Sequence, residues 1–309
     1  MATPRPLPPR DDQRMLGIRL RIASISCFAT MSALAKLANG GGASTLEILF
    51  FRNGLALPVI IGVLLAGPGL RSVATKRPGA HLGRSVIGLG SMLLTFQGLS
   101  MLPLADATSI GFSAPLFATI LSAVLLAEPI HRHRWTAIAI GMIGVLIIMR
   151  PGGGHASLAG MAIAVGGAFT SAIATVTIRS LGTTEPATTT VFWFTLGGTI
   201  ATSLVLPFVA QAHDPLTWCA LVGTGLAGGC AQVLMTTSLR HAPVSVVAPF
   251  DYLSLPWSIL YGFLLFSAAP SATTLAGAAL IVASGLYTIH RERRLRRDAI
   301  AAASTPVEA

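Results

Sequence analysis

One carboxylate interrupts an otherwise apolar run of this chain. Asp251 lies within VSVVAPFDYLSLPWSILYGFLLF, residues 244–266. An ionisable side chain inside a bilayer is costly unless it faces a partner or a wet cavity, so it marks a functional site by default. Asp251 is therefore expected to accept a proton or to bind a cationic group of a substrate. A salt bridge that holds two helices together is the alternative interpretation.

The prolines near this carboxylate favour a position beside a cavity. Proline lacks an amide hydrogen and clashes with the preceding turn, so it kinks a helix and frees carbonyl groups. Irregular backbone at membrane depth is tolerated where it lines a cavity or is buried in protein. We therefore predict that this segment lines a central cavity, with helix kinks at Pro249 and Pro256 and another at Pro115.

Two cations form a second candidate site. Lys36 and Arg52 are expected in the outer half of the membrane, where they could attract a substrate carboxylate or phosphate. Glu47 and Asp106 are expected at similar depth and could neutralise them. Ion pairing, or snorkelling of the long side chains towards water, is the alternative.

Aromatic and amide side chains complete the candidates. Tyr252, Trp257 and Trp193 could stack against a planar substrate, and Gln97 and Gln232 could face the cavity or bond a neighbouring helix. The full set of candidate substrate-binding or coupling residues is Asp251, Tyr252, Trp257, Lys36, Arg52, Gln97, Asp106, Trp193 and Gln232.

The composition indicates which elements position these residues. With 53% hydrophobic and 10% charged residues, this chain of 309 residues is not an ordinary soluble domain. A helix needs about 20 mainly apolar residues to cross a bilayer, and such windows recur along nearly the whole chain. The sequence predicts an all-α membrane protein with ten transmembrane helices, near residues 17–38, 47–67, 83–101, 105–127, 135–149, 157–179, 187–209, 216–238, 244–267 and 272–290.

Other functional classes lack their sequence signals. The three cysteines and seven histidines form no ligand pattern, and the turn HRH at 131–133 is expected to be solvated. There is no G-x-x-x-x-G-K-[ST] phosphate loop, no H-E-x-x-H and no G-x-S-x-G. We therefore expect no enzyme activity, no metal and no cofactor.

The basic residues predict the orientation. Most of the 21 lysines and arginines fall on one side if the N-terminus is cytoplasmic, including Arg21 near the N-terminus and Arg84 in the connection between the second and third crossings. Lys and Arg in short loops favour the cytoplasm. The terminal RERRLRR is interpreted as part of this anchoring rather than as a nucleic-acid tail, so no nucleic acid is expected. The prediction is a multi-pass protein of the bacterial inner membrane with both termini cytoplasmic.

An internal repeat predicts the architecture. At an offset of 141 residues Pro115 matches Pro256, Ser113 matches Ser254 and Gly144 matches Gly285. The fourth and fifth crossings therefore recur as the ninth and tenth, and an odd number of helices per copy makes the repeat inverted. Such repeats alternately open a midplane cavity to each side. The predicted organisation is a tail at 1–14, repeats at 15–150 and 151–291, and a tail at 292–309.

These segments also resemble a known family. FRN at 51–53, LPLADATSIGFSAPLFATILSAVLLAEP at 102–129, GMIGVLIIMRPGG at 141–153 and VVAPFDYLSLPWSILYGFLLF at 246–266 are similar to the EamA family of the drug/metabolite transporter superfamily. The resemblance implies two EamA repeats, ten helices, cytoplasmic termini and secondary transport of small organic molecules. One departure is Ala269, which stands opposite Glu128 where such repeats often carry glutamate.

The functional hypothesis is a secondary active transporter of a small organic metabolite that works by alternating access. Candidate substrates are an amino acid, a riboflavin-like vitamin or a compound like S-adenosylmethionine, with coupling to protons through Asp251. A drug or metabolite exporter is the alternative; a passive channel, a lipid-handling protein and an intramembrane enzyme account for fewer of the features. The expected partners are the substrate and the bilayer, and a homodimer is left open.

Overall fold

The described chain is built from helices. A computed structural model describes residues 11–67, 69–126, 132–149, 157–181 and 184–304, and no strand occurs in these ranges. Glu128, which stands opposite Ala269 in the repeat, lies outside them. The helices are α1 (Asp11–Gly40), α2 (Thr45–Leu65), η1 (Leu70–Val73), α3 (Pro78–Met101), α4 (Leu104–Gly111), α5 (Ala114–Leu126), α6 (Arg132–Met149), α7 (Leu158–Leu181), α8 (Ala187–Val209), α9 (Pro215–His241), α10 (Val244–Val247), η2 (Ala248–Leu253), α11 (Ser254–Phe266) and α12 (Ala272–Ser304).

Among the residues that the structure describes, seven helical segments are long and apolar enough to cross a membrane. They are α1, α2, α4 with most of α5, α7, α8, α9 and the first part of α12. The other predicted windows also fall on helices: α3 carries several polar side chains, α6 is shorter, and the window 244–267 is divided among α10, η2 and α11. These seven candidate spans indicate a multi-pass membrane protein, and the number ten stays a prediction.

The two interrupted windows break at equivalent places. Pro115 is the second residue of α5, and its repeat partner Pro256 is the third residue of α11. Proline is tolerated there because first-turn amides have no partner within the helix. The aligned serines also match, since each hydroxyl donates to the carbonyl three residues earlier, Ser113 to Ile110 at 2.7 Å and Ser254 to Asp251 at 2.8 Å. Pro249 is the second residue of η2.

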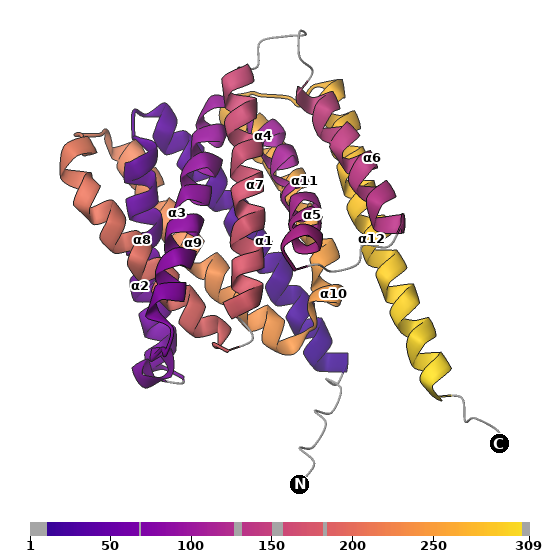
Figure 1. Cartoon of the computed structure of the whole chain (residues 1–309). Helices are drawn as coiled ribbons and strands as arrows, with labels where there is room; N and C mark the ends of the chain where they lie inside the picture. The colour runs from indigo at the N-terminus through magenta and orange to yellow at the C-terminus, as the bar shows by residue number, and fades with distance from the viewer. Residues whose placement is uncertain (1–10, 68, 127–131, 150–156, 182–183, 305–309) are drawn as a thin grey trace, which may run out of the picture.

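The packing follows the repeat. Helix α1 of the first copy packs along α9 of the second. The equivalent pair, in which α7 of the second copy packs along α3 of the first, is also present. The helices α6 and α12, which correspond in the two copies, also form one pair (Figure 1). Helix α7 begins at the end of the bundle opposite to the beginning of α1, as expected for two copies of opposite orientation (Figure 1).

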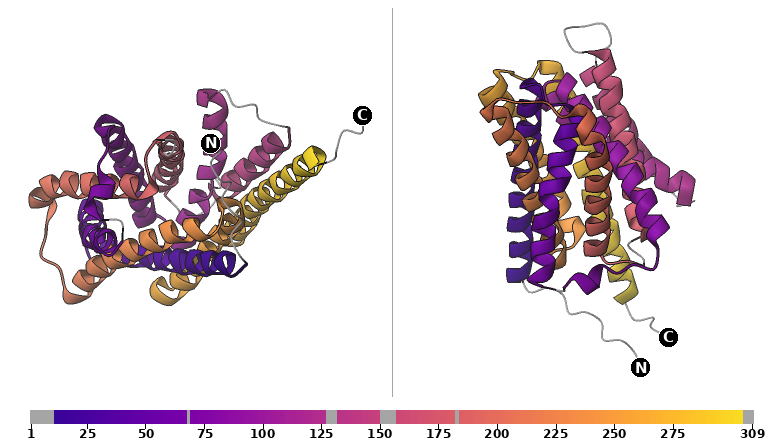
Figure 2. Two further views of the ribbon diagram at one scale, coloured as in Figure 1. Left: turned by 90° about the horizontal axis from the view of Figure 1, so that it is seen from below. Right: turned by 90° about the vertical axis from the view of Figure 1, so that its left-hand side faces the viewer.

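Both ends of the described chain lie at one end of the bundle. Helix α1 begins and α12 ends at the same end of the bundle, as both side views show (Figures 1 and 2). We call this the termini end and the opposite one the far end.

Two glycines allow α6 and α12 to pack closely, because a Cβ at Gly144 would lie 2.6 Å from the carbonyl oxygen of Gly277.

Candidate functional site

A central cavity lies where the two repeats meet. Its volume is about 390 Å³, and α1, α2, α3 and α4 of the first copy line it together with α7 and α11 of the second. Hydroxyl groups from five helices face it, including Ser32, Ser91, Thr108, Ser171, Ser254 and Ser258. Apolar walls with a few convergent polar groups are typical of small-molecule sites.

Arg52 is the charged side chain among the described residues that line this cavity. It is 5% exposed, its Nη1 donates to Oδ1 of Asn53 at 2.9 Å, and its Nε has no hydrogen-bond partner among the described residues. Its guanidinium carbon lies 5.8 Å from the ring centroid of Phe194. Of the sequence candidates, this is the one that the structure places at the central cavity.

Asp251 is paired with a cation of another helix. Nε and Nη2 of Arg21 donate to its two carboxylate oxygens, each at 2.6 Å, in the bidentate arrangement that gives the strongest charge-assisted bonds. The side chain of Arg21 is 14% exposed and that of Asp251 37%. The structure therefore contains the salt bridge that the sequence left as the alternative, and a role of Asp251 in coupling stays a prediction.

This ion pair lies on the termini side of the central cavity. Arg21 precedes the cavity residue Phe28 by two turns of α1, which is about 10 Å along a helix. Asp251 precedes Ser254, another cavity residue, by one turn. The pair thus joins α1 to η2 between the cavity and the termini end.

A second cavity of about 360 Å³ adjoins this region. Asp251 and Tyr252 line it together with residues of α5, α6 and α12, and Gly111 lines both cavities. The ring of Tyr252 lies 5.0 Å from that of Phe112. Tyr252 is therefore placed near the break between α4 and α5 rather than at the central cavity.

Three further candidates form hydrogen bonds between helices nearer the far end. Nζ of Lys36 donates to the carbonyl oxygens of Leu99 at 2.9 Å and Leu102 at 2.6 Å, so it caps the C-terminus of α3 and suits the negative end of its dipole. Asp106 accepts from Thr274 at 2.6 Å, and Gln97 accepts from Thr45 at 2.7 Å. None of the three candidates lines the central cavity.

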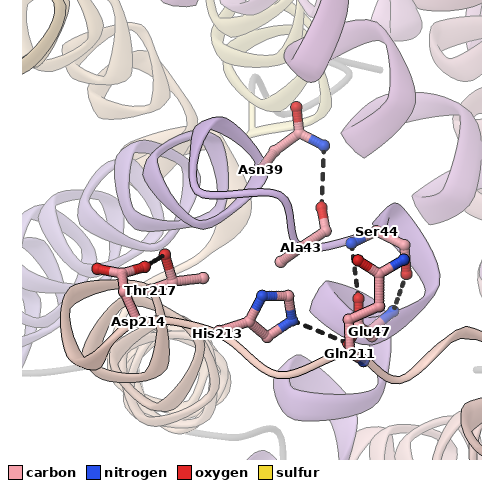
Figure 3. A network of polar contacts seen from close by, with 8 residues as sticks. All are labelled: Asn39, Ala43, Ser44, Glu47, Gln211, His213, Asp214 and Thr217. Carbon is pink, nitrogen blue, oxygen red and sulfur yellow. Dashed lines mark hydrogen bonds and ion pairs between the residues drawn. The ribbon is translucent and has the colours of Figure 1, made fainter.

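Glu47 closes a network at the far end (Figure 3). It forms a capping box with Ser44 at the start of α2, and its Oε1 lies 3.0 Å from the amide nitrogen of Gln211 and from Nε2 of His213. Neither Glu47 nor Asp106 pairs with Lys36 or Arg52, so the ion pairs considered from the sequence are not found among the described side chains.

The remaining candidates also lie outside the central cavity. Nε1 of Trp193 donates to the carbonyl oxygen of Val73 at 2.8 Å, and the ring of Trp257 stacks on that of Tyr261 at 5.6 Å. Gln232 lines a small cavity of about 40 Å³ between α2, α8 and α9. The interpretation of these residues as substrate contacts stays a prediction.

Sequence reasoning missed Arg21 and Arg84 as cations that lie within the helical bundle. Both were assigned to the basic cytoplasmic segments, yet Arg84 is 9% exposed and stacks on Phe194 with its guanidinium carbon 4.3 Å from the ring centroid. A signal was available in the spacing of His81, Arg84, Gly88 and Ser91, which places all four on one face of α3.

Known proteins share this sequence pattern and fold. The pattern of the EamA-like transporter family matches residues 15–150 and again 158–289. A riboflavin transporter of Vibrio cholerae serotype O1 is 29% identical over 273 residues, covering 87% of this chain and 91% of the relative. A pseudopaline exporter of Pseudomonas aeruginosa is 29% identical over 272 residues, covering 86% and 93%. A solved crystal structure that is 21% identical in sequence matches with a TM-score of 0.64. The match covers 90% of this chain and 98% of the chain in that structure, and it shows that the two share a fold.

Proposed function

Because this chain belongs to the EamA-like transporter family, we propose that it is a secondary carrier of a small organic metabolite that works by alternating access. The observation that carries the proposal is the central cavity of about 390 Å³ between the two repeats, with hydroxyl groups and Arg52 on its wall. Midplane sites between inverted repeats are where secondary carriers bind their substrates. The volume falls in the range of about 300–1,000 Å³ of small-molecule pockets.

The proposed topology has ten crossings with both termini in the cytoplasm of a bacterial cell. It is supported by the position of both chain ends at one end of the bundle (Figure 1). It is also supported by the basic residues Arg71, Lys76 and Arg77 in the connection between α2 and α3, since positive loops favour the cytoplasmic side. The termini end is then cytoplasmic and the far end periplasmic.

The proposed substrates are vitamin-sized or amino-acid-derived metabolites. One relative is named a riboflavin transporter and another a pseudopaline exporter, so relatives of similar identity differ in substrate. Export is a second candidate direction, and the exporter among the relatives favours it.

We further propose that the Arg21–Asp251 pair opens during the transport cycle. It joins α1 to the 3-10 segment of the second repeat on the termini side of the cavity, where the chain is irregular and bordered by a second cavity. Protonation of Asp251 would release Arg21, and this would couple opening to protons.

A metabolite comparison tests the proposed function. The full chain and its Arg52→Gln variant are expressed in a bacterial host beside an empty vector, and metabolites of cells and medium are measured. The proposal expects a small set of metabolites to change with the wild-type chain and to return towards the vector control with Arg52→Gln. The exposed Arg71→Gln serves as the matched control that keeps the wild-type effect. Identical profiles for vector and wild type, with the protein present in the membrane, would oppose it.

A further inference from the structure

Unpartnered polar atoms gather in one region of the described bundle. Among the described residues, the buried side-chain nitrogen and oxygen atoms without a hydrogen-bond partner are Nε of Arg52, both ring nitrogens of His81, Nε and Nη1 of Arg84, and Oγ of Ser109. Buried polar groups are nearly always satisfied, so such a concentration points to an occupant that the chain itself does not supply. All but one of these atoms belong to α3 or to the neighbouring Arg52 on α2.

The two guanidinium groups face a shared ring. The guanidinium carbon of Arg84 lies 4.3 Å and that of Arg52 5.8 Å from the ring centroid of Phe194 on α8. Arg84 donates no hydrogen bond to any residue that the structure describes, and Arg52 donates only to Asn53. No described carboxylate lies within ion-pair distance of either group.

The backbone leaves room for Arg84 to extend towards the central cavity. Its Nη1 occupies the space that a Cβ of Gly88 would fill, one turn further along α3 in the direction of the cavity residue Ser91. Helical side chains normally lean towards the helix N-terminus, so this reach in the opposite direction depends on a glycine at position 88. The guanidinium group of Arg84 therefore extends away from the termini end and towards Arg52.

Two other cations within the bundle, Arg21 and Lys36, have hydrogen-bond partners among the described residues. Arg21 has the carboxylate of Asp251, and Lys36 has two backbone carbonyls. An uncompensated buried charge is strongly destabilising, and two of the same sign near one ring also repel each other. The planar donor fork of arginine matches the two oxygens of a carboxylate or phosphate.

We propose that Arg52 and Arg84 form an oxyanion subsite that extends the central cavity between α2, α3 and α8 and receives the carboxylate or phosphate of the transported metabolite. This assignment rests on the proposed function, because it names the class of substrate that the carrier takes. A neutral or purely cationic metabolite leaves both guanidinium groups without a counter-charge. The transported species is therefore an organic anion, or a zwitterion whose carboxylate enters this subsite.

Thermal unfolding of the purified full chain in detergent tests the subsite. Potassium phosphate, potassium succinate and neutral succinamide are compared with potassium chloride at matched ionic strength. Phosphate or succinate is expected to raise the Tm by about 3 °C at concentrations near ten times Kd, and succinamide is expected to leave it unchanged. The variants Arg52→Gln and Arg84→Gln lose the shift, while Arg71→Gln, which alters an exposed arginine, keeps it.

A second measurement separates ligand binding from a purely structural role. Without an oxyanion, Arg84→Gln is expected to unfold at the same temperature as the wild type or above it, because an unpaired charge has been removed. A purely structural guanidinium would make that variant less stable. Should the glutamine variants fail to fold, Arg84→Lys retains the charge but not the fork, and the expected result is a reduced shift. Equal shifts with chloride and with the oxyanions would overturn the oxyanion subsite.

Metabolite counterflow in proteoliposomes distinguishes the source of the oxyanion. If the anion belongs to the substrate, Arg52→Gln and Arg84→Gln raise the KM of the transported metabolite at least tenfold. An unchanged KM, with a phosphate shift that these variants abolish, means that a free anion occupies the site and contradicts the assignment to the substrate. Counterflow of a metabolite without carboxylate or phosphate overturns the inference and leaves the proposed carrier intact, whereas absence of any counterflow counts against the carrier itself.

Discussion

Arg21 on α1 and Asp251 on η2 are 230 residues apart in the chain and are joined by two hydrogen bonds of 2.6 Å. We expect Arg21→Gln or Asp251→Asn alone to lower the free energy of unfolding by about 1 kcal/mol. The effect falls below the 3–5 kcal/mol of a fully buried pair because the side chain of Asp251 is 37% exposed. A double-mutant cycle of thermal unfolding measures the coupling. If the losses of unfolding free energy in the two single variants simply add in the double variant, a direct interaction is contradicted.

The same carboxylate gives a prediction about coupling. If protonation of Asp251 releases Arg21, Asp251→Asn removes the pH dependence of uptake into proteoliposomes while the protein still inserts and folds. The measurement is the initial uptake rate of an identified substrate across a pH series. Asp214→Asn, which alters an exposed carboxylate outside the spanning helices, is the control expected to keep that dependence. Equal pH profiles for the wild type and Asp251→Asn would exclude the proton role.

The irregular backbone at η2 is predicted to serve motion rather than stability. Pro249→Ala restores an amide donor and permits a regular helix through this segment. We expect a several-fold lower transport rate with no loss in Tm, because the hinge between α10 and α11 becomes stiffer. Pro58→Ala, at an exposed proline inside the continuous helix α2, is the matched control and leaves the rate unchanged. A wild-type rate for Pro249→Ala would refute the hinge.

The α6–α12 contact is predicted to tolerate no side chain. A Cβ at Gly144 would lie 2.6 Å from the carbonyl oxygen of Gly277 and 2.8 Å from Cγ1 of Ile281. Gly144→Ala should therefore force the helices apart and destabilise the fold by about 1–3 kcal/mol. Gly62→Ala, where a new Cβ meets nothing within 4 Å, should instead stabilise α2 by about 0.5–1 kcal/mol. Thermal unfolding of the two variants compares them, and opposite signs are expected.

Glu47 is predicted to be structural. Its carboxylate accepts from the amide groups of Ser44 and Gln211 and lies 3.0 Å from Nε2 of His213 (Figure 3). Glu47→Ala removes the capping box and leaves buried donors unpaired, at a cost of about 2–4 kcal/mol in unfolding free energy. Asp214→Ala, at the N-cap of α9 beside this network, should cost about 1 kcal/mol. Transport with an unchanged KM in Glu47→Ala is expected, and a large change in KM would place this residue at the substrate.

Much of the fold was predictable because the bilayer imposes long apolar helices. The windows, the matched Pro115 and Pro256, and the family resemblance led to an all-helical protein with two repeats. The described helices confirm the first part and the two family matches confirm the second. The interruption of the window that contains Asp251 also has a local cause in Pro249 and Pro256. These features depend on residues close together in the chain.

The partners of the polar residues were not predictable in the same way. Sequence gives the depth of a residue along its helix, but a helix that is apolar all round carries no signal for the face that meets the bundle. The pairing of Asp251 with Arg21 depends on such a face, as does the bond from Lys36 to the end of α3. Arg84 was assigned to a basic loop because it follows the basic residues of that connection, although Gly88 gives it room inside the bundle.

Exchange of metabolites across a proteoliposome membrane tests the carrier most directly. Vesicles that contain the purified chain hold unlabelled bacterial extract, and the same extract with an isotope label is added outside. We predict that at least one small metabolite enters faster than into protein-free vesicles, at a rate that saturates with its outside concentration and rises when unlabelled metabolite is present inside. Flux that grows linearly with concentration and ignores the inner metabolite, or no protein-dependent flux at all, would contradict alternating access through the central cavity.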